Sequence, residues 1–389
     1  MQRGIQSRSA QNNTKNYLLN SMRILFATPY KGITGGISRW AENIINYYNA
    51  IKTDVELDVL PMNDTKECSA ADFIGNSKTK RVARGLRTYG HAIKALRSKL
   101  KEAKYDVLHI ASSASISLLK DIVMMRIARR HGVKSVLHFH FGRIPDLSKR
   151  ANWEWKMLLR AVKLSDETIV IDRASYDTLI ANGCTNVEYV PNPLASAIGA
   201  IVSGIEVARE PNMLLFVGQC LPTKGVCELV DACRTIPNVE LWMLGAITDS
   251  MLQELTARWD SSLRLHIVGN LPFEEVIKMM CQCDVFILPT YTEGFPNVIL
   301  ESMACGCAIV TTPVGAIPEM LEEEDGKHYG IMVEPRNVEQ LKDAIERMLS
   351  DADFKRECRA NVQQRVNERY NIDSVWRQMV DIWRGLEIK

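Results

Sequence analysis

Short apolar stretches alternate with helical stretches along the whole chain, and this alternation restricts the fold more than any other feature. Strands that alternate with helices form parallel sheets whose two faces are covered by those helices. The expected strands are Arg23–Ala27, Leu57–Leu60, Val107–Ile110, Ser135–Phe139 and Thr168–Ile171, then Met213–Val217, Leu241–Leu244, Leu265–Val268, Val285–Leu288 and Ala308–Val310. The sequence therefore predicts an α/β protein with two Rossmann-like, doubly wound parallel-sheet domains facing a cleft.

The length of 389 residues accommodates two domains of ordinary size. An irregular stretch opens at Pro191 and ends near Asn212, and we place the link between the domains there. We expect an N-terminal extension over residues 1–21, domains over residues 22–195 and 211–370, and a C-terminal helix over residues 371–389. That helix carries an apolar stripe suited to docking, formed by Val375, Trp376, Met379, Val380 and Trp383.

Composition excludes several classes of function. The net charge of +2 indicates no nucleic-acid partner. No apolar run approaches the roughly 18 residues that span a bilayer. The first residues are polar and lack the apolar core of a signal peptide, so the ten cysteines predict reduced thiols in the cytoplasm.

The segment Thr292–Met320 carries the strongest motif. Glu293 and Glu301 flank a Gly-Phe-Pro-Asn turn, Gly294–Asn297, and apolar stretches precede and follow. The order therefore reads strand, loop, helix, strand. Open α/β sheets bind ligands at such loops, and the unpaired N–H groups of a helix start attract phosphate. We expect the helix to start at Pro296 or the next residue, with Glu301 about one turn inside it.

This segment resembles the donor-site signature of the retaining glycosyltransferases of family 4, which have the GT-B fold. The pattern Glu-Gly-Phe-Pro-x4-Glu is matched without a gap, and the likeness continues through Pro313–Gly315 and Ile317–Glu319. It extends over most of Met22–Tyr370. The resemblance implies two Rossmann-like domains with a C-terminal helix that crosses back to the first domain. It also implies transfer of a sugar from a nucleotide-diphosphate donor with retention.

Two features of the first half resemble the same family. Gly35 and Gly36 follow the first strand, like a Gly-Gly loop beside the donor phosphates and the acceptor, although a tight turn explains them equally well. His140 resembles the histidine that contacts the transferred sugar. His138 lies on the same strand face, and His109 ends another strand at the same sheet edge. For these last two, a packed core position is the favoured interpretation.

The second half departs from the family at one position. The family has Gly-Arg after the first strand of this domain and a lysine five residues later. Gly218 and Lys224 match, but Gln219 stands where arginine is usual. Two cations suit a diphosphate leaving group, on which negative charge builds. We therefore expect Lys224 to act alone or with a basic group from elsewhere, for which Arg143 and Arg173 are candidates.

The resemblance assigns a role to each of these residues. Glu301 holds the donor ribose, Glu293 and the Gly294–Asn297 backbone address the sugar and phosphates, and His140 acts near the anomeric carbon. The expected catalytic residues are His140, Lys224 and Glu293. The expected donor-binding residues are Gly35, Gly36, Gly218, Gln219, Lys224, Glu293, Gly294, Phe295, Pro296, Asn297 and Glu301. In this family the leaving phosphate is thought to take the acceptor proton, which agrees with the lack of an obvious general base.

No metal and no other cofactor are expected. Metal-dependent transferases often show Asp-x-Asp, and the instance here, at Asp351 and Asp353, is typical of a helix N-cap. The two Cys-x-Cys pairs, which begin at Cys281 and Cys305, lack zinc-knuckle spacing and indicate buried thiols. The donor is then a UDP-sugar or a GDP-sugar held by cations and helix N-termini.

The stretch Lys78–Lys104 contains ten basic residues and a single acid, Glu102. Its apolar residues are spaced as one helical face. A basic amphipathic helix can rest on anionic lipid, and a solvated cationic face over a core stripe fits equally well. An acceptor carried on a polyprenyl diphosphate would favour contact with the inner membrane.

The sequence thus predicts a cytoplasmic glycosyltransferase that acts on a glycan or polyprenyl-linked acceptor in bacterial surface polysaccharide synthesis. A GT-B sugar-nucleotide epimerase, a phosphorylase and an inactive donor-binding scaffold stay open as alternatives, the last supported only by Gln219. A glycosidase that uses Glu293 and Glu301 as its carboxylate pair is disfavoured, because the rest of the chain reads as a nucleotide binder.

Overall fold

The computed structural model describes residues 21–30, 36–62, 78–259 and 264–388. The chain divides into two compact units. The first comprises Met1–Val170, Tyr176–Val190 and Trp376–Lys389, and the second comprises Ile171–Ser175 and Pro191–Val375. The C-terminal helix α17 (Ile372–Ile388) therefore contributes its residues from Trp376 onward to the first unit.

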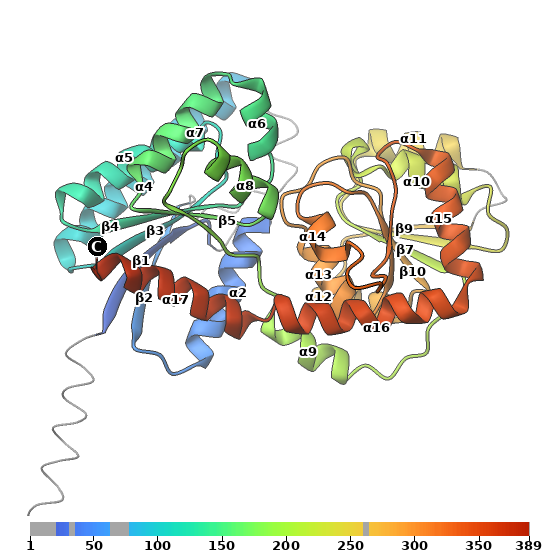
Figure 1. Cartoon of the computed structure of the whole chain (residues 1–389). Coiled ribbons are helices and arrows are strands. Elements are labelled where there is room, and N and C mark those ends of the chain that lie inside the picture. Colours follow the sequence, from blue (N-terminus) through green and yellow to red (C-terminus); the bar gives the residue numbers. More distant parts are fainter. Residues whose placement is uncertain (1–20, 31–35, 63–77, 260–263, 389) are drawn as a thin grey trace, which may run out of the picture. The chain divides into compact units, whose positions relative to one another are not determined.

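The first unit contains one parallel sheet of six strands. In spatial order these are β2 (Val55–Pro61), β1 (Met22–Thr28), β3 (Val107–Ser112), β4 (Lys134–Phe139), β5 (Glu167–Val170) and β6 (Val187–Tyr189). Its helices are α2 (Gly36–Ala50), α4 (Lys78–Glu102), α5 (Ser117–Arg130), α6 (Ile144–Arg150), α7 (Trp153–Leu164), most of α8 (Arg173–Ala181) and α17. Helices α4, α5 and α7 cover one face of the sheet, and α2 and α17 cover the other (Figure 1).

The second unit repeats the plan with a different strand order. Its sheet runs β12 (Ile331–Met332), β11 (Ala308–Thr311), β10 (Val285–Leu288), β7 (Met213–Val217), β8 (Glu240–Leu244) and β9 (Arg264–Gly269), all parallel. Its helical elements are α9 (Ser196–Ser203), η1 (Pro222–Lys224), α10 (Val226–Cys233), α11 (Asp249–Arg258), α12 (Phe273–Gln282), α13 (Asn297–Ala304), α14 (Ile317–Leu321), α15 (Val338–Ser350) and α16 (Ala352–Arg369).

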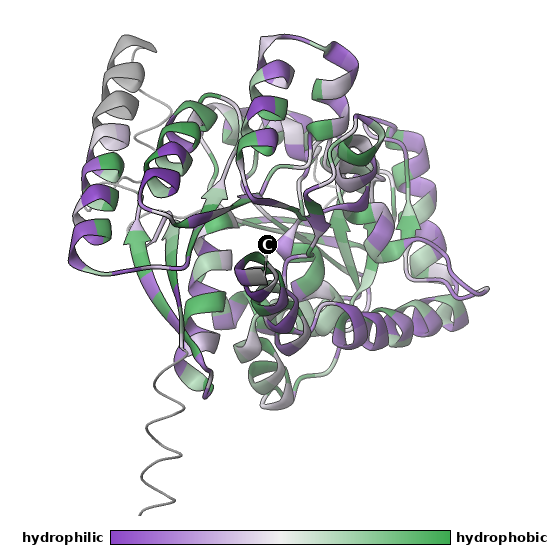
Figure 2. Ribbon diagram, turned by 60° about the vertical axis from the view of Figure 1, so that its left-hand side comes forward, coloured by the Kyte–Doolittle hydropathy of each residue, from purple (hydrophilic) through white to green (hydrophobic). Residues whose placement is uncertain are grey.

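Each unit has its own hydrophobic core between sheet and helices. Figure 2 shows the strands mostly in green, the colour of hydrophobic residues, and the helices with purple, hydrophilic faces. Strands buried on both faces read as continuous apolar runs, which explains why they were recognisable in the sequence. The predicted α/β class with two doubly wound sheets is confirmed.

The structure differs from the predicted elements in three places. Strands β6 and β12 were not predicted, because runs of three and two residues carry no usable periodicity. The stretch after Pro191 was predicted to be irregular, but it contains α9. That helix buries Ile198 in the core of the second unit, and the tertiary contact outweighs the weak local signal.

Strand order fixes where ligands can bind. In the second unit the chain order reverses between β7 and β10, which are adjacent strands. In the first unit it reverses between β1 and β3. Open α/β sheets bind ligands at such reversals, outside the carboxyl ends of the strands. The loops after β7 and β10 are thus the first place to look in the second unit.

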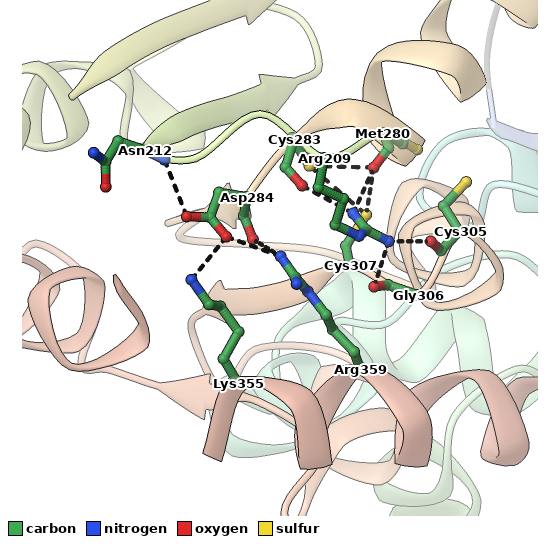
Figure 3. Close-up of polar contacts among 10 residues, drawn as sticks. All are labelled: Arg209, Asn212, Met280, Cys283, Asp284, Cys305, Gly306, Cys307, Lys355 and Arg359. Atoms are coloured by element: carbon green, nitrogen blue, oxygen red, sulfur yellow. Dashed lines mark hydrogen bonds and ion pairs between the residues drawn. The ribbon is translucent and has the colours of Figure 1, made fainter. Parts of the chain in front are cut away.

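A guanidinium anchors the amino-terminal end of the second sheet, opposite those loops (Figure 3). Arg209 precedes β7 and donates to backbone carbonyls on two separate segments. Its acceptors are the carbonyls of Met280 (3.3 Å), Cys283 (2.8 Å), Cys305 (2.6 Å) and Gly306 (2.7 Å). One side chain therefore ties the segment before β7 to the segments that lead into β10 and β11.

A carboxylate ties α16 to the same end of the sheet (Figure 3). Asp284 Oδ1 accepts from Lys355 Nζ at 2.8 Å and from Arg359 Nη2 at 2.9 Å, and its Oδ2 accepts from the Asn212 N–H at 3.0 Å. Burial disfavours the charge of Asp284, but the Lys355 and Asn212 hydrogen bonds and the Arg359 charge outweigh it and lower its pKa.

Candidate donor site and sugar-contact site

The loops after β7 and β10 are locked together at the strand reversal of the second unit. Gly225 has φ +70°, and a Cβ there would lie 2.1 Å from the Pro289 carbonyl oxygen. The Tyr291 N–H donates to the Thr223 carbonyl at 2.8 Å. A residue with a side chain at position 225 would force these loops apart, so the close approach requires glycine.

This approach brings Lys224 and Glu293 into an ion pair. Lys224 ends η1, after β7, and Glu293 follows β10, 69 residues further along the chain. The side chains are 25% and 12% exposed, so the pair is partly desolvated but still reachable from solvent. Sequence reasoning gave both residues to the donor site but missed their contact, because the β7–β10 pairing that creates it is not visible in the sequence.

A third loop supports the peptide that follows Glu293. The Ala316 N–H donates to the Gly294 carbonyl at 2.9 Å. A Cβ on Gly315, at φ +59°, would lie 2.5 Å from the Glu293 carbonyl oxygen. The loop after β11 therefore packs directly on the Glu293–Gly294 peptide and fixes its orientation.

Helix α13 begins next to this peptide. It starts at Asn297 with Pro296 as N-cap, as predicted, and its first turn contains no acidic residue. The positive end of the helix is thus not neutralised by its own side chains. Glu301 lies one turn inside and is 4% exposed, and Phe295 is buried with its ring edge-on to Tyr370 at 5.7 Å.

Gly218 and Gln219 lie directly after β7. The Gly218 N–H donates to the Leu244 carbonyl at 2.9 Å, and Gln219 is exposed. The candidate replacement cations lie in different units. Arg143 is exposed in the first unit, with its guanidinium 4.8 Å from the Phe141 ring centre. Arg173 is exposed in the second unit, where its backbone N–H donates to Glu319 at 2.9 Å.

In the first unit the structure places His140 immediately after β4. Its N–H donates to the Ser112 carbonyl at 2.9 Å, and its half-buried ring lies 4.1 Å from the Trp40 ring and 4.2 Å from the His138 ring. Gly36 is the exposed first residue of α2, and among the described residues no atom lies within 4 Å of a Cβ added there. Gly35 lies outside the described residues.

The prediction that His109 ends a strand is wrong. Strand β3 continues to Ser112, so His109 is mid-strand and fully buried, as is His138 on β4 apart from 1% of its surface. Burial, followed by repulsion from His140, lowers the pKa of His109 to about 3. The same two causes, with repulsion from His109 added, lower the pKa of His138. The preferred core interpretation of these two histidines is confirmed.

Sequence reasoning missed a strained turn beside His140. Ala114 and Ser115, just after β3, adopt φ of 58° and 57°, which non-glycine residues rarely do. Ser112 Oγ holds the turn by donating to Asp121 at 2.6 Å and accepting from the Ala114 N–H at 3.1 Å. The run of small residues after an apolar strand was the available signal.

Other sequence features have structural explanations. Among the described residues no group of three or more His, Cys, Asp or Glu side chains is placed to hold a metal ion. Asp351 is the N-cap of α16 and accepts from the Phe354 N–H at 3.0 Å, as predicted. The nine cysteines in the described ranges are free thiols, and all but Cys281 are buried. No helix in those ranges is long and apolar enough to cross a membrane.

Two family models match the chain. The model for Glycosyltransferase Family 4 matches residues 34–195, and the model for Glycosyl transferases group 1 matches residues 211–351. Together they cover most of the chain, including His140 in the first unit and the Lys224–Glu293 pair in the second.

Individual proteins agree with the family match. An uncharacterized glycosyltransferase of Methanocaldococcus jannaschii is 23% identical over 86% of this chain and 90% of its own length. The capsular polysaccharide biosynthesis glycosyltransferase CapM of Staphylococcus aureus is 26% identical over 43% of this chain and 44% of its own length. Several other relatives are matched over less than half of their length. The crystal structure of Anabaena HepE with UDP-glucose superposes with a TM-score of 0.66 and 18% sequence identity. The superposition covers 94% of this chain and 100% of the HepE chain.

Proposed function

Because this chain belongs to the group 1 glycosyltransferases of family 4, we propose that it transfers a sugar, with retention, from a nucleotide-diphosphate sugar to a glycan or lipid-linked saccharide. One observation carries the proposal. Lys224, Glu293 and the start of α13 meet at the strand reversal of the second unit, where an α/β sheet binds its ligand. The HepE complexes with UDP and UDP-glucose favour a UDP-sugar, with a GDP-sugar as the alternative.

The residues of the second unit divide the donor between them in this proposal. The N–H groups at the start of α13 and the Gly294 peptide face the phosphates. Glu301 accepts hydrogen bonds from the ribose hydroxyls. Glu293 binds the sugar, and the backbone at Gly218 and Gln219 lies close to the phosphates. His140 is proposed to contact the sugar near its anomeric carbon, a role that rests on its resemblance to the family histidine.

Lys224 serves the leaving group. When the bond between the anomeric carbon and the phosphate oxygen breaks, its electron pair stays on the diphosphate, and the ammonium stabilises that charge. A phosphate oxygen then takes the acceptor hydroxyl proton as the new bond forms on the same face. No step requires a metal, so we expect activity to survive excess chelator. Loss of activity on chelation that magnesium or manganese restores would overturn this part of the proposal.

The acceptor is proposed to be a bacterial surface polysaccharide or its polyprenyl-linked precursor, which the name of CapM supports. The enzyme would then act in the cytoplasm, with α4 against the inner membrane. Lys94, Arg97 and Lys101 are exposed on α4, and the adjacent α5 exposes Leu119. Cosedimentation with anionic but not neutral vesicles tests this, and charge reversal at Arg97 and Lys101 should abolish it. Equal binding to neutral vesicles would exclude it.

Product analysis tests the proposed reaction. We expect release of the nucleoside diphosphate only when donor and acceptor are both present, with the label of the donor sugar transferred to the acceptor. Conversion of the donor sugar to its epimer without acceptor would show an epimerase, and dependence on inorganic phosphate would show a phosphorylase. Donor binding without turnover over a broad acceptor panel would show a scaffold.

A further inference from the structure

A chain of hydrogen-bonded rings runs through the core of the first unit and ends beneath His140. Trp383, on α17, is fully buried, and its indole Nε1–H lies 3.0 Å from His109 Nδ1 on β3. His109 Nε2 in turn lies 3.2 Å from His138 Nδ1 on β4. The residues at the two ends of the first contact are 274 positions apart in the sequence.

The Trp383 indole at one end sets the direction of both hydrogen bonds in this row of rings. A tryptophan N–H is only a donor, so His109 Nδ1 must be the acceptor and carries no proton. Neutral His109 then holds its proton on Nε2 and donates it to His138 Nδ1. His138, whose Nδ1 is an acceptor, must hold its own proton on Nε2. A second proton on either ring would place two donors face to face, so the same geometry keeps both rings uncharged.

His138 connects these two rings to His140, the residue proposed to contact the sugar. Its ring stacks on that of His140 with 4.2 Å between centroids and 28° between planes, and Trp40 packs against both. Within the described residues His138 Nε2 has no hydrogen-bond partner, so the proton on that atom is held in place only by the ring chain behind it.

We infer that Trp383 is a positioning residue for His140: it fixes the proton positions of His109 and His138 and thereby the ring dipole on which His140 rests. The inference deepens the proposed function, because it gives the C-terminal helix a part in the sugar-contact site. Without the indole donor, His109 is free to carry its proton on Nδ1 and to accept at Nε2. His138 then moves its proton from Nε2 to Nδ1, so one lost donor reverses both rings.

Nitrogen-15 NMR of the histidine rings tests the inference on the unaltered protein. The chain has seven histidines, and single replacements assign the signals of His109 and His138. Both rings should be neutral with the proton on Nε2. A proton on Nδ1 in either ring, or a charged ring at neutral pH, would overturn the inference before any variant is made.

Trp383→Phe then removes the donor and keeps an aromatic ring. We expect a population with the proton on Nδ1 in both histidines, and a fall in kcat of about 10-fold with the donor KM unchanged. Trp376→Phe is the matched control, because Trp376 is also buried on α17 and touches Trp383 edge-on at 5.6 Å. Trp376→Phe should leave the tautomers of both histidines, kcat and the donor KM unchanged.

The outcomes separate this inference from the proposed function. Reversed tautomers with unchanged kcat in Trp383→Phe would break the link to His140. A wild-type rate for His140→Ala would instead remove His140 from the proposed mechanism and leave the tautomer assignment standing. If Trp383→Phe does not fold, the tautomers of the unaltered protein and of Trp376→Phe still decide the first step.

Discussion

Among single residues, the Lys224–Glu293 ion pair is the contact that a diphosphate would meet in the proposed donor site. A diphosphate that approaches Lys224 must share the ammonium with a carboxylate that is already in contact with it. The two side chains are partly desolvated, which strengthens their attraction relative to a surface pair. In the proposed mechanism the pair would hold Lys224 in place for the leaving group and would lower the affinity for the diphosphate.

Replacing Lys224 tests its role in catalysis. Lys224→Ala should lower kcat by about 10²-fold, the usual effect of losing one group that stabilises developing negative charge. Steady-state kinetics with the donor identified by product analysis measures this. Loss of affinity without loss of kcat would show that Lys224 only binds the ground state.

Gln219→Arg tests the departure from the family pattern. The position is exposed directly after β7, so an arginine has room. If Lys224 acts alone, activity should be preserved or raised. A clear fall in kcat/KM would show that another cation, such as Arg143 or Arg173, already occupies that region.

Asp172 gives a prediction for pH dependence. It is 1% exposed and lies two residues after β5, and burial raises its pKa to about 6 despite the hydrogen bond from the Ser175 N–H. Its unfolded pKa is about 3.9, so its protonation stabilises the fold below about pH 4, and that contribution is lost as pH rises through 6. Asp172→Asn should therefore raise stability at pH 7 by about 1–3 kcal/mol and leave it unchanged near pH 4.

Urea unfolding at the two pH values measures this difference. Asp177→Asn is the control, because Asp177 is exposed on the following helix, α8. Equal effects of Asp172→Asn at both pH values would contradict the assignment.

At the scale of elements, the site loops stand on a sheet whose opposite end is held by charged side chains. Asp284 joins the start of β10 to α16, and Arg209 joins the segment before β7 to those before β10 and β11. These contacts position β7 and β10 side by side and so position Lys224 against Glu293. Stability at one end of the sheet thus supports site geometry at the other.

Asp284→Asn should destabilise the protein by about 2–4 kcal/mol, because it leaves Lys355 and Arg359 partly buried without a counter-charge. Denaturant unfolding at neutral pH is the measurement. Asp353→Asn on α16, the helix of Lys355 and Arg359, is the control, since its ion pair with Arg356 is highly exposed and should contribute less than about 0.5 kcal/mol. Similar losses for the two variants would show that the Asp284 contacts do not hold the sheet.

The sequence predicted ten of the strands because each contains a short apolar run, which is buried in most of them although β9 is only partly buried. It predicted the start of α13 because Pro296 and Asn297 are typical of a helix start. It did not predict contacts that depend on strand order. The Lys224–Glu293 pair and the Trp383–His109 hydrogen bond both join residues far apart in the chain. The end of β3 was predicted at His109, three residues before its actual end at Ser112, because an apolar strand followed by serines has no sharp boundary signal.

For the molecule as a whole, the proposed function requires that the second unit binds a nucleotide-diphosphate sugar through the loop and helix after β10. The folded chain suits a direct binding measurement, since a ligand that binds the native state also raises the unfolding midpoint. A thermal-shift screen of UDP-, GDP-, ADP- and CMP-sugars identifies the donor. The same screen supplies the ligand for calorimetry.

Titration calorimetry of that donor into the wild type and into Glu301→Ala tests this binding mode. Glu301 is buried on α13, so removing its carboxylate should leave the ribose hydroxyls without their acceptor. We predict that Glu301→Ala binds the donor more weakly by about 1–3 kcal/mol, or roughly 5- to 150-fold in Kd. Val298→Ala, on the same helix and only partly buried, is the control and should bind the donor like the wild type. Unchanged affinity in Glu301→Ala would contradict the assignment of the donor site.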